Sequence, residues 1–204
     1  PLLHQSQAAA LGLYDSASRS FQEEIARSVG MNPALFPSVT GELSLLGEYR
    51  GVPVSVSLGD NQASFLGSVR QARQTLLVNV GTGAQISLYA ERPFQAPGAE
   101  SRPFLGSSCL LVGSALCGGA AYAALEGFFR EYAVAAGAPD QPQYDVMARL
   151  LADAPGRPWQ VCTAFSGTQE DPSASGSVQG LRREDLHPAG FIAGVLYGMA
   201  QELY

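Results

Sequence analysis

The chain has 204 residues, 46% of them hydrophobic and 15% charged, which is enough apolar material to bury the core of one large domain or parts of two. Twelve basic and 18 acidic residues give a net charge of −6, which argues against a surface for nucleic acid or for an anionic membrane. Three cysteines without a C-x-x-C pair, and two histidines far apart, predict reduced thiols, a cytoplasmic location and no metal-ligating cluster.

The first predicted helix covers residues 18–33 (SRSFQEEIARSVGMNP). Ser20 and Glu23 have the spacing of a capping box at its start, and Gly30 is a typical residue to end it. Further along the chain we expect strands at 51–59, 104–116 and 159–165, a hairpin at 74–91, and helices at 61–72, 117–137, 144–155 and 187–204.

This mixture of strands and helices predicts an α/β fold with a mixed sheet. Residues 104–125 carry no charge and are long enough to raise the question of a membrane span. Their glycines and serines favour a strand followed by a buried helix instead. The last predicted helix still runs at Tyr204, and the chain begins at Pro1, so we expect a piece of a longer polypeptide.

Asp60 lies where the strand pattern of 51–59 stops and a helical pattern begins. A structural interpretation is a helix N-cap, because the carboxylate accepts a backbone N–H there. A functional interpretation is a carboxylate at the carboxyl end of a strand, where α/β sheets bind ligands. The two are compatible, because a helix N-terminus favours the ionised acid.

Two glycine-rich stretches follow Asp60. Gly81-Thr82-Gly83 lies between two strand patterns, so it predicts either a tight hairpin turn or a loop whose backbone approaches a phosphate. Gly118 and Gly119 open the helix at 117–137, where they allow close packing or leave the N-terminus open to an anion.

The polar stretch at 166–181 (SGTQEDPSASGSVQGL) predicts a solvated loop. Glu170 and Asp171 are alternative candidates for active-site acids, although their spacing matches no established pair of catalytic carboxylates.

The order of these motifs resembles the FGGY family of carbohydrate kinases. The similarity covers nearly the whole chain and runs through LGLYD, GDNQA, VNVGTGAQ, the Gly-Gly helix entry and GTQEDPSASGSVQGL. GDNQA and GTGAQ together are its most specific part, and the pair is most similar to the sedoheptulokinase branch.

The resemblance implies two actin-like lobes with a ribonuclease-H-like core and a cleft between them. Residues 1–73 would end the N-terminal, sugar-binding lobe, and residues 74–204 would begin the C-terminal, nucleotide-binding lobe. Both lobes would be incomplete in this chain. The implied reaction is transfer of the γ-phosphoryl group of ATP, with Mg²⁺, to a hydroxyl of a ketose or polyol.

The resemblance also assigns roles to individual residues. Asp60 corresponds to the catalytic base, and Asn61 and Gln85 lie where sugar hydroxyls would bind. The nucleotide phosphates would be bound by Gly81, Thr82, Gly83, Gly118 and Gly119. No residue of the chain is assigned to a metal. No nucleic-acid or membrane partner is implied, and a homodimer stays open.

The chain departs from the family at several places. A D-x-G-T-like phosphate hairpin and the glycine-rich adenine motif are not in this sequence, and Gln169 stands where an Arg is often found. We therefore expect residues 1–204 alone to be inactive. The alternatives are an inactive protein of the same fold that binds nucleotide or sugar, and an actin-like ATPase with a protein client.

Overall fold

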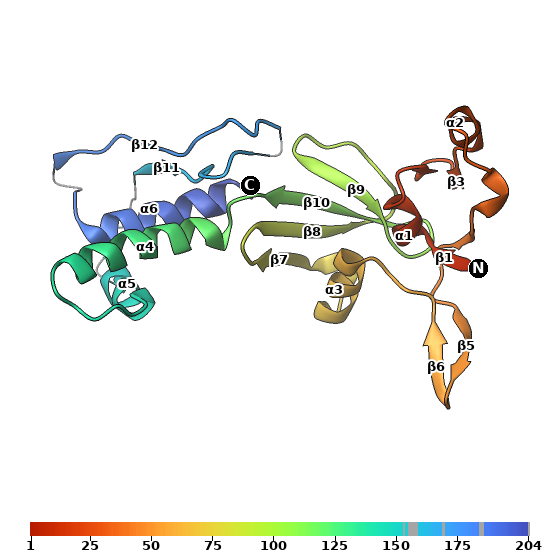
Figure 1. The fold of residues 1–204 in the computed structure, drawn as a ribbon, viewed down its shortest axis with the longest axis horizontal. Coiled ribbons are helices and arrows are strands. Elements are labelled where there is room, and N and C mark those ends of the chain that lie inside the picture. The colour runs from red at the N-terminus through yellow and green to blue at the C-terminus, as the bar shows by residue number, and fades with distance from the viewer. Residues whose placement is uncertain (153, 155–158, 169, 184–185, 204) are drawn as a thin grey trace. The chain divides into compact units, whose positions relative to one another are not determined.

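The computed structural model describes residues 1–152, 154, 159–168, 170–183 and 186–203 (Figure 1). The expected helix end at Pro155 and the contact at Gln169 lie outside these residues. The helices are α1 (Gln5–Ala9), α2 (Glu23–Ser28), α3 (Asp60–Ser68), α4 (Gly119–Ala135), α5 (Tyr144–Ala152) and α6 (Pro188–Gln201). The strands are β1 (Leu2–His4), β2 (Tyr14–Asp15), β3 (Ser20–Phe21), β4 (Ser38–Thr40), β5 (Leu45–Tyr49), β6 (Val52–Ser55), β7 (Leu76–Val80), β8 (Ala84–Ala90), β9 (Ala99–Pro103), β10 (Cys109–Ala115), β11 (Gln160–Cys162) and β12 (Ser177–Gln179).

The chain divides into two compact units. The first contains Pro1–Leu77 and Ile86–Gly113, and the second contains Val78–Gln85 and Ser114–Tyr204. Residues 86–113, which the sequence placed with the second lobe, therefore cluster with the first unit. The assignment of a sugar lobe to 1–73 and a nucleotide lobe to 74–204 stays a prediction.

A four-stranded sheet has the strand order β7-β8-β10-β9. β7 and β8 are neighbours joined by residues 81–83, which confirms the predicted hairpin. β9 pairs antiparallel with β10, so that Arg102 lies opposite Leu110. The sequence did not predict β9, because its Glu, Ser, Arg and Pro residues are not typical of strands.

The apolar core of the first unit fixes the position of helix α3. Phe65 is fully buried and packs with Phe104, Leu110 and Val112. The rings of Phe65 and Phe104 meet edge to face, with their centroids 5.8 Å apart. Burial of these side chains holds α3 in place, and with it the first turn that begins at Asp60.

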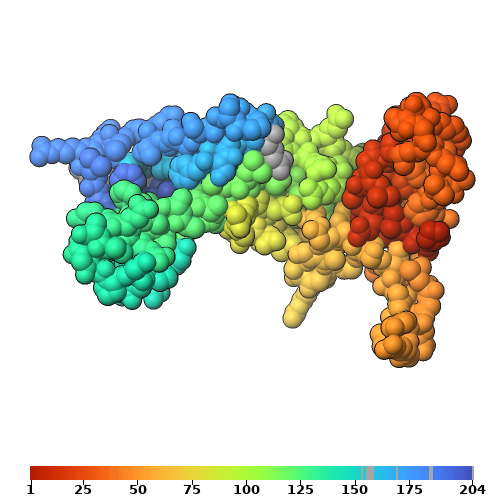
Figure 2. Space-filling view, viewed as in Figure 1, coloured from red at the N-terminus to blue at the C-terminus, as the bar shows by residue number. Residues whose placement is uncertain are grey.

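Strand β6 is shorter than the strand expected over 51–59, and it pairs only with β5 among the described strands. The two form a separate hairpin, which stands out from the rest of its unit in orange (Figure 2). Arg50 and Gly51 in its turn both have positive φ, 51° and 79°, as a two-residue type I′ turn requires. Strand β6 therefore ends at Ser55, well before Asp60, although the strand pattern of the sequence continues to residue 59.

The second unit packs helices α4 and α6 together, with α5 and the β11–β12 pair against α6 (Figure 1). Its core contains Cys117, Ala121, Val161 and Val195. A Cβ added to Gly198 would lie 2.2 Å from the carbonyl oxygen of Val161, so only glycine allows α6 to approach β11 this closely.

Two expectations about helix ends were wrong. The first helix does not start at Ser20, because Ser20 pairs with Asp15 in the β2–β3 ladder and α2 begins at Glu23. The last helix ends at Gln201 instead of running to Tyr204.

The uncharged stretch at 104–125 forms strand β10 and the start of α4, which confirms the expectation of a strand and a helix. Among the residues that the structure describes, no helix is both long and apolar enough to span a membrane.

Candidate functional site

Asp60 is the first residue of helix α3, and Gly59 occupies the N-cap position with extended backbone. The expectation that Asp60 itself caps the helix was therefore wrong. The exposed carboxylate lies in the first turn, where the helix dipole favours a negative charge, and its Oδ1 accepts the backbone N–H of Asn61 at 2.7 Å. The expected position at the end of a sheet strand is also wrong, because β6 belongs to the separate hairpin.

Side chains from the short helix α1 hold the backbone just before Asp60. Gln7 donates from Nε2 to the carbonyl oxygen of Leu58 at 2.8 Å. The N–H of Gly59 donates to the hydroxyl oxygen of Ser6 at 2.9 Å. These two bonds fix the peptide units on which the position of Asp60 depends. Among the described strands, none includes residues 58 and 59, so side chains hold this segment in place of a β-sheet ladder.

The imidazole of His4 orients the Ser6 hydroxyl through a hydrogen bond. The ring is fully buried, and its Nδ1 lies 2.7 Å from the Oγ of Ser6 and 3.2 Å from the Ser6 backbone N–H. Because the Ser6 backbone N–H donates to Nδ1, this nitrogen is an acceptor, which favours the neutral imidazole with its proton on Nε2 and a Ser6 hydroxyl that donates to Nδ1. Burial lowers the pKa of His4, which the Gly41 carbonyl and the Glu42 charge only partly oppose.

A cavity of about 530 Å³ contains Asp60 on its wall. This volume is typical of a site for a small molecule. Most of its lining side chains are polar. Burial raises the pKa of the Tyr14 phenol, which is one of them, further above neutral pH. The lining residues are Ser6, Gln7, Ala9, Ala10, Tyr14, Ser16, Gly59, Asp60, Gln62, Glu100, Ser101, Arg102 and Pro103.

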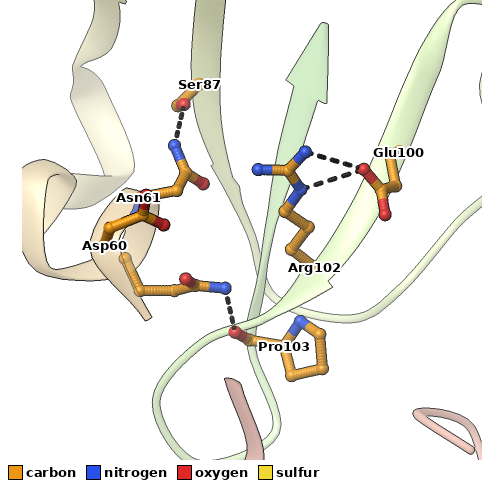
Figure 3. A network of polar contacts seen from close by, with 7 residues as sticks. Asp60, Asn61, Ser87, Glu100, Arg102 and Pro103 are labelled. Carbon is orange, nitrogen blue, oxygen red and sulfur yellow. Dashed lines mark hydrogen bonds and ion pairs between the residues drawn. The ribbon is translucent and has the colours of Figure 1, made fainter. Parts of the chain in front are cut away.

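The residues that follow Asp60 anchor the first turn of α3 to the sheet (Figure 3). Asn61 is only 8% exposed and donates from Nδ2 to the Ser87 hydroxyl of β8 at 3.1 Å. Gln62 donates from Nε2 to the carbonyl oxygen of Pro103 at 2.9 Å. Asn61 thus has an evident structural role, and its expected contact with sugar stays a prediction.

Sequence reasoning missed the charged pair Glu100 and Arg102 on β9. Arg102 donates from Nε and Nη2 to the Oε2 of Glu100, at 2.9 and 2.8 Å (Figure 3). Both residues line the same cavity as Asp60. The available signal was the spacing E-x-R, which brings both side chains to one face once the segment is known to be a strand.

In the second unit, the loop Gly81-Thr82-Gly83 is bonded through its backbone to the start of α4. The N–H of Gly81 donates to the carbonyl of Gly83 at 2.8 Å and closes the turn. The N–H groups of Gly119 and Ala120 donate to the carbonyls of Gly81 and Thr82, at 2.7 and 3.0 Å. Two of the N–H groups at the α4 N-terminus are therefore directed at the loop.

Glycine is required on the helix side of this contact. A Cβ on Gly118 would lie 2.4–2.6 Å from backbone atoms of Gly83 and Ala84, and one on Gly119 would lie 2.5 Å from the Gly81 oxygen. These glycines thus have the structural role of close packing, and binding of phosphate by the same backbone stays a prediction. Thr82 is exposed at the tip of the loop, and Gln85 is half-buried on β8.

The loop at 166–181 contains a hydrogen-bonded turn around Asp171. Its Oδ1 accepts from the N–H and hydroxyl of Ser173, at 2.9 and 2.6 Å, and the Ser173 hydroxyl bond is the main reason that the pKa of Asp171 is lowered. Both Glu170 and Asp171 are exposed, which favours the solvated loop over a pair of active-site acids. Residues 177–179, predicted as loop, form strand β12.

No protein-family model matches this chain. An "uncharacterized sugar kinase" of Archaeoglobus fulgidus is 34% identical over 98 residues, which are 48% of this chain and 20% of that protein. The chain thus spans about a fifth of the length of this curated relative.

Three solved structures share the fold. Gluconate kinase from Lactobacillus acidophilus has a TM-score of 0.82 at 18% identity, over 100% of this chain and 43% of its own. Xylulose kinase from Rhodospirillum rubrum has a TM-score of 0.79 at 18% identity, over 98% of this chain and 42% of its own. Plasmodium falciparum glycerol kinase with ADP has a TM-score of 0.75 at 14% identity, over 98% of this chain and 42% of its own. These structures confirm the expected mixed α/β fold, of which this chain contains part, and the sugar-kinase relative agrees with the resemblance to FGGY carbohydrate kinases.

Proposed function

We propose that the full-length protein transfers the γ-phosphoryl group of ATP to a hydroxyl of a ketose or polyol, with Asp60 as general base. The observation that carries this proposal is the position of Asp60 on the wall of a polar cavity of about 530 Å³, with its backbone held by Ser6 and Gln7. Similarity to a sugar kinase across 48% of the chain supports the same reaction class.

Asp60 orients the acceptor hydroxyl and receives its proton as the new O–P bond forms. The transition state of phosphoryl transfer is loose, so alignment of the hydroxyl matters more than the strength of the base. An ordinary ionised carboxylate at a helix N-terminus is therefore adequate. The fixed backbone of Leu58 and Gly59 provides the alignment.

The glycine loop supports the nucleotide part of the proposal. Gly81, Thr82 and Gly83 carry no bulky side chain, and Gly81 and Thr82 are exposed, which suits close approach of a phosphate. Gly118 and Gly119 pack against this loop and would hold its backbone in place for the phosphate. ATP bound there would supply the phosphoryl group. Among the described residues, no cluster of three or more His, Cys, Asp or Glu side chains is placed to hold a metal ion. Mg²⁺ would arrive on the phosphates of ATP.

We also propose the sedoheptulokinase-like branch, on the GDNQA and GTGAQ motifs, with Asn61 and Gln85 near the sugar. A cytoplasmic location is supported by free Cys109, Cys117 and Cys162. A homodimer stays open, and we expect residues 1–204 by themselves to be inactive.

The test is a coupled kinase assay of the full-length protein with glycerol, xylulose, sedoheptulose and gluconate. Asp60→Asn should lower kcat by about 10²- to 10⁴-fold, as expected for loss of a general base, while ATP still binds. Glu91→Gln, an exposed acid of the same unit, is the matched control and should keep wild-type turnover. Wild-type turnover by Asp60→Asn would overturn the assignment. Binding of sugar or nucleotide without transfer by the wild type would identify the inactive binding protein instead.

A further inference from the structure

Strand β9 brings two opposite charges into the cavity of Asp60. Glu100 and Arg102 are two residues apart, so their side chains lie on the same face of the strand. Both line the cavity, while Asp60 enters it from the start of α3 (Figure 3). A molecule bound in this cavity that is long enough would therefore contact Asp60 and the pair together.

The pair is held in a defined geometry. Two nitrogens of the Arg102 guanidinium donate to one oxygen, Oε2, of Glu100. This contact fixes the guanidinium plane but does not use the N–H groups on Nη1 or the second carboxylate oxygen. One edge of the Glu100–Arg102 pair thus offers N–H donors of the guanidinium beside an acceptor oxygen of the carboxylate.

Such an edge is complementary to two adjacent hydroxyl groups. One hydroxyl donates to the carboxylate oxygen, and its neighbour accepts from the guanidinium. A stability role explains the pair less well, since the side chain of Glu100 is 67% exposed and exposed ion pairs contribute little.

We propose that Glu100 and Arg102 determine the acceptor specificity of this site by binding a vicinal diol of a neutral polyhydroxylated substrate, at a distance from the hydroxyl that Asp60 activates. This inference rests on the proposed function, because it names the substrate class of the same site.

The charges of the cavity favour a neutral substrate. Among the described lining residues, Asp60 and Glu100 are negative and Arg102 is positive, which leaves an excess of one negative charge. Since Arg102 is already neutralised by Glu100, it offers little attraction to the carboxylate of a sugar acid or to a phosphate. Removal of the Glu100 charge should make the cavity more tolerant of an anion.

The first test removes the guanidinium. In the full-length protein, Arg102→Gln should lower kcat/KM by about 10- to 100-fold for xylulose and sedoheptulose, because a site that binds a substrate hydroxyl through a charged group loses that much with it. The loss should be smaller for glycerol, which is too short to supply both contacts. Arg73→Gln is the matched control, because Arg73 pairs with Glu91 in the same unit but does not line the cavity.

The second test changes the charge. Glu100→Gln should raise kcat/KM for gluconate relative to xylulose, since Arg102 is then free to attract the carboxylate. Calorimetric titration of each sugar, without ATP, measures affinity independently of phosphoryl transfer. In that titration Arg102→Gln should weaken xylulose and sedoheptulose binding, and Arg73→Gln should not.

The results separate the two proposals. If the wild type phosphorylates sugars and Arg102→Gln lowers kcat/KM equally for short and long acceptors, the specificity role is overturned while the kinase stands. If the wild type binds long sugars through Arg102 but transfers no phosphoryl group, the proposed function fails and the binding role stands. If no sugar binds or reacts, both proposals are overturned.

Discussion

The two units support their candidate residues in different ways. In the first unit, the position of Asp60 depends on side chains that come from far along the chain: Gln7 and Ser6 hold residues 58 and 59, and Asn61 is bonded to Ser87. In the second unit, the loop at 81–83 depends on backbone alone, with carbonyls bonded to the N–H groups at the start of α4.

This difference predicts how each part responds to substitution. A side-chain contact tolerates a conservative replacement that keeps the hydrogen bond, and it responds to protonation where a histidine participates. The backbone contact at Gly83, Gly118 and Gly119 has no such freedom, because a Cβ at each of these positions would lie within 3 Å of peptide atoms. Substitutions in the two units therefore test this contrast.

Gly118→Ala should be the most disruptive change. Its Cβ would lie 2.4–2.6 Å from backbone atoms of Gly83 and Ala84, so the loop or the helix must shift. We expect a loss of about 3 kcal/mol in the free energy of unfolding, measured by urea denaturation.

Gly127→Ala is the matched control for this experiment. Gly127 lies in the same helix, and a Cβ there meets nothing within 4 Å. Because alanine is the better helix former, the free energy of unfolding should rise by about 0.5–1 kcal/mol. If the two variants are equally stable, the loop and the helix are not in the close contact described here.

Ser6→Ala should have a smaller effect on stability and a selective effect on turnover. It removes the acceptor of the Gly59 N–H, which costs about 1–2 kcal/mol when the donor is left unpaired. Since this bond fixes the peptide before Asp60, kcat should fall more than the KM for sugar rises. Ser6→Thr keeps the hydroxyl and should restore most of kcat, whereas failure of Thr to restore it would show that the hydroxyl does not act in this way.

His4 should make the first unit sensitive to mild acid. Its pKa is lowered in the folded protein from the usual value of 6.5, so the unfolded chain takes up a proton first as the pH falls. The free energy of unfolding is then unaffected by His4 above pH 6.5. Below that it decreases toward the folded-state pKa, by up to about 1.4 kcal/mol per pH unit.

Urea denaturation between pH 7 and pH 5 measures this decrease, in a window above the titration of the carboxylates. His4→Gln keeps a hydrogen-bonding side chain without a titrating group, and should have a flatter profile over the same range. An unchanged slope in that variant would assign the acid sensitivity to another group.

The same contrast explains what the sequence could predict. The glycine loop was recognisable because its chemistry lies in adjacent residues, and a Gly-x-Gly between two strand patterns is enough to indicate a hairpin. Asp60 could be picked out from the sequence as a candidate functional residue, but the side chains that hold it in position could not. Gln7, Ser87 and Arg102 meet near it only through tertiary packing, and none of them stands in a pattern that indicates this contact.

The glycines at 118 and 119 show the opposite limit. Their sequence pattern was equally compatible with close packing and with an open anion site, and only the atoms within 3 Å of each missing Cβ reveal the packing. The sequence shows where a glycine allows close approach of backbone, whereas its neighbours in the folded structure determine whether that space holds peptide atoms or an anion.

The smallest expected effect is at Asp171. This carboxylate is exposed and accepts bonds within its own turn from Ser173, so its lowered pKa reflects local hydrogen bonds and not a catalytic environment. Asp171→Asn should keep kcat and KM for sugar within about twofold of wild type, as is usual for surface substitutions. Comparison with Asp60→Asn in the same assay shows whether the loss of turnover is specific to the carboxylate in the cavity or follows the removal of either carboxylate. A large loss of kcat in Asp171→Asn would return this loop to the active site, and the solvated-loop interpretation would then be wrong.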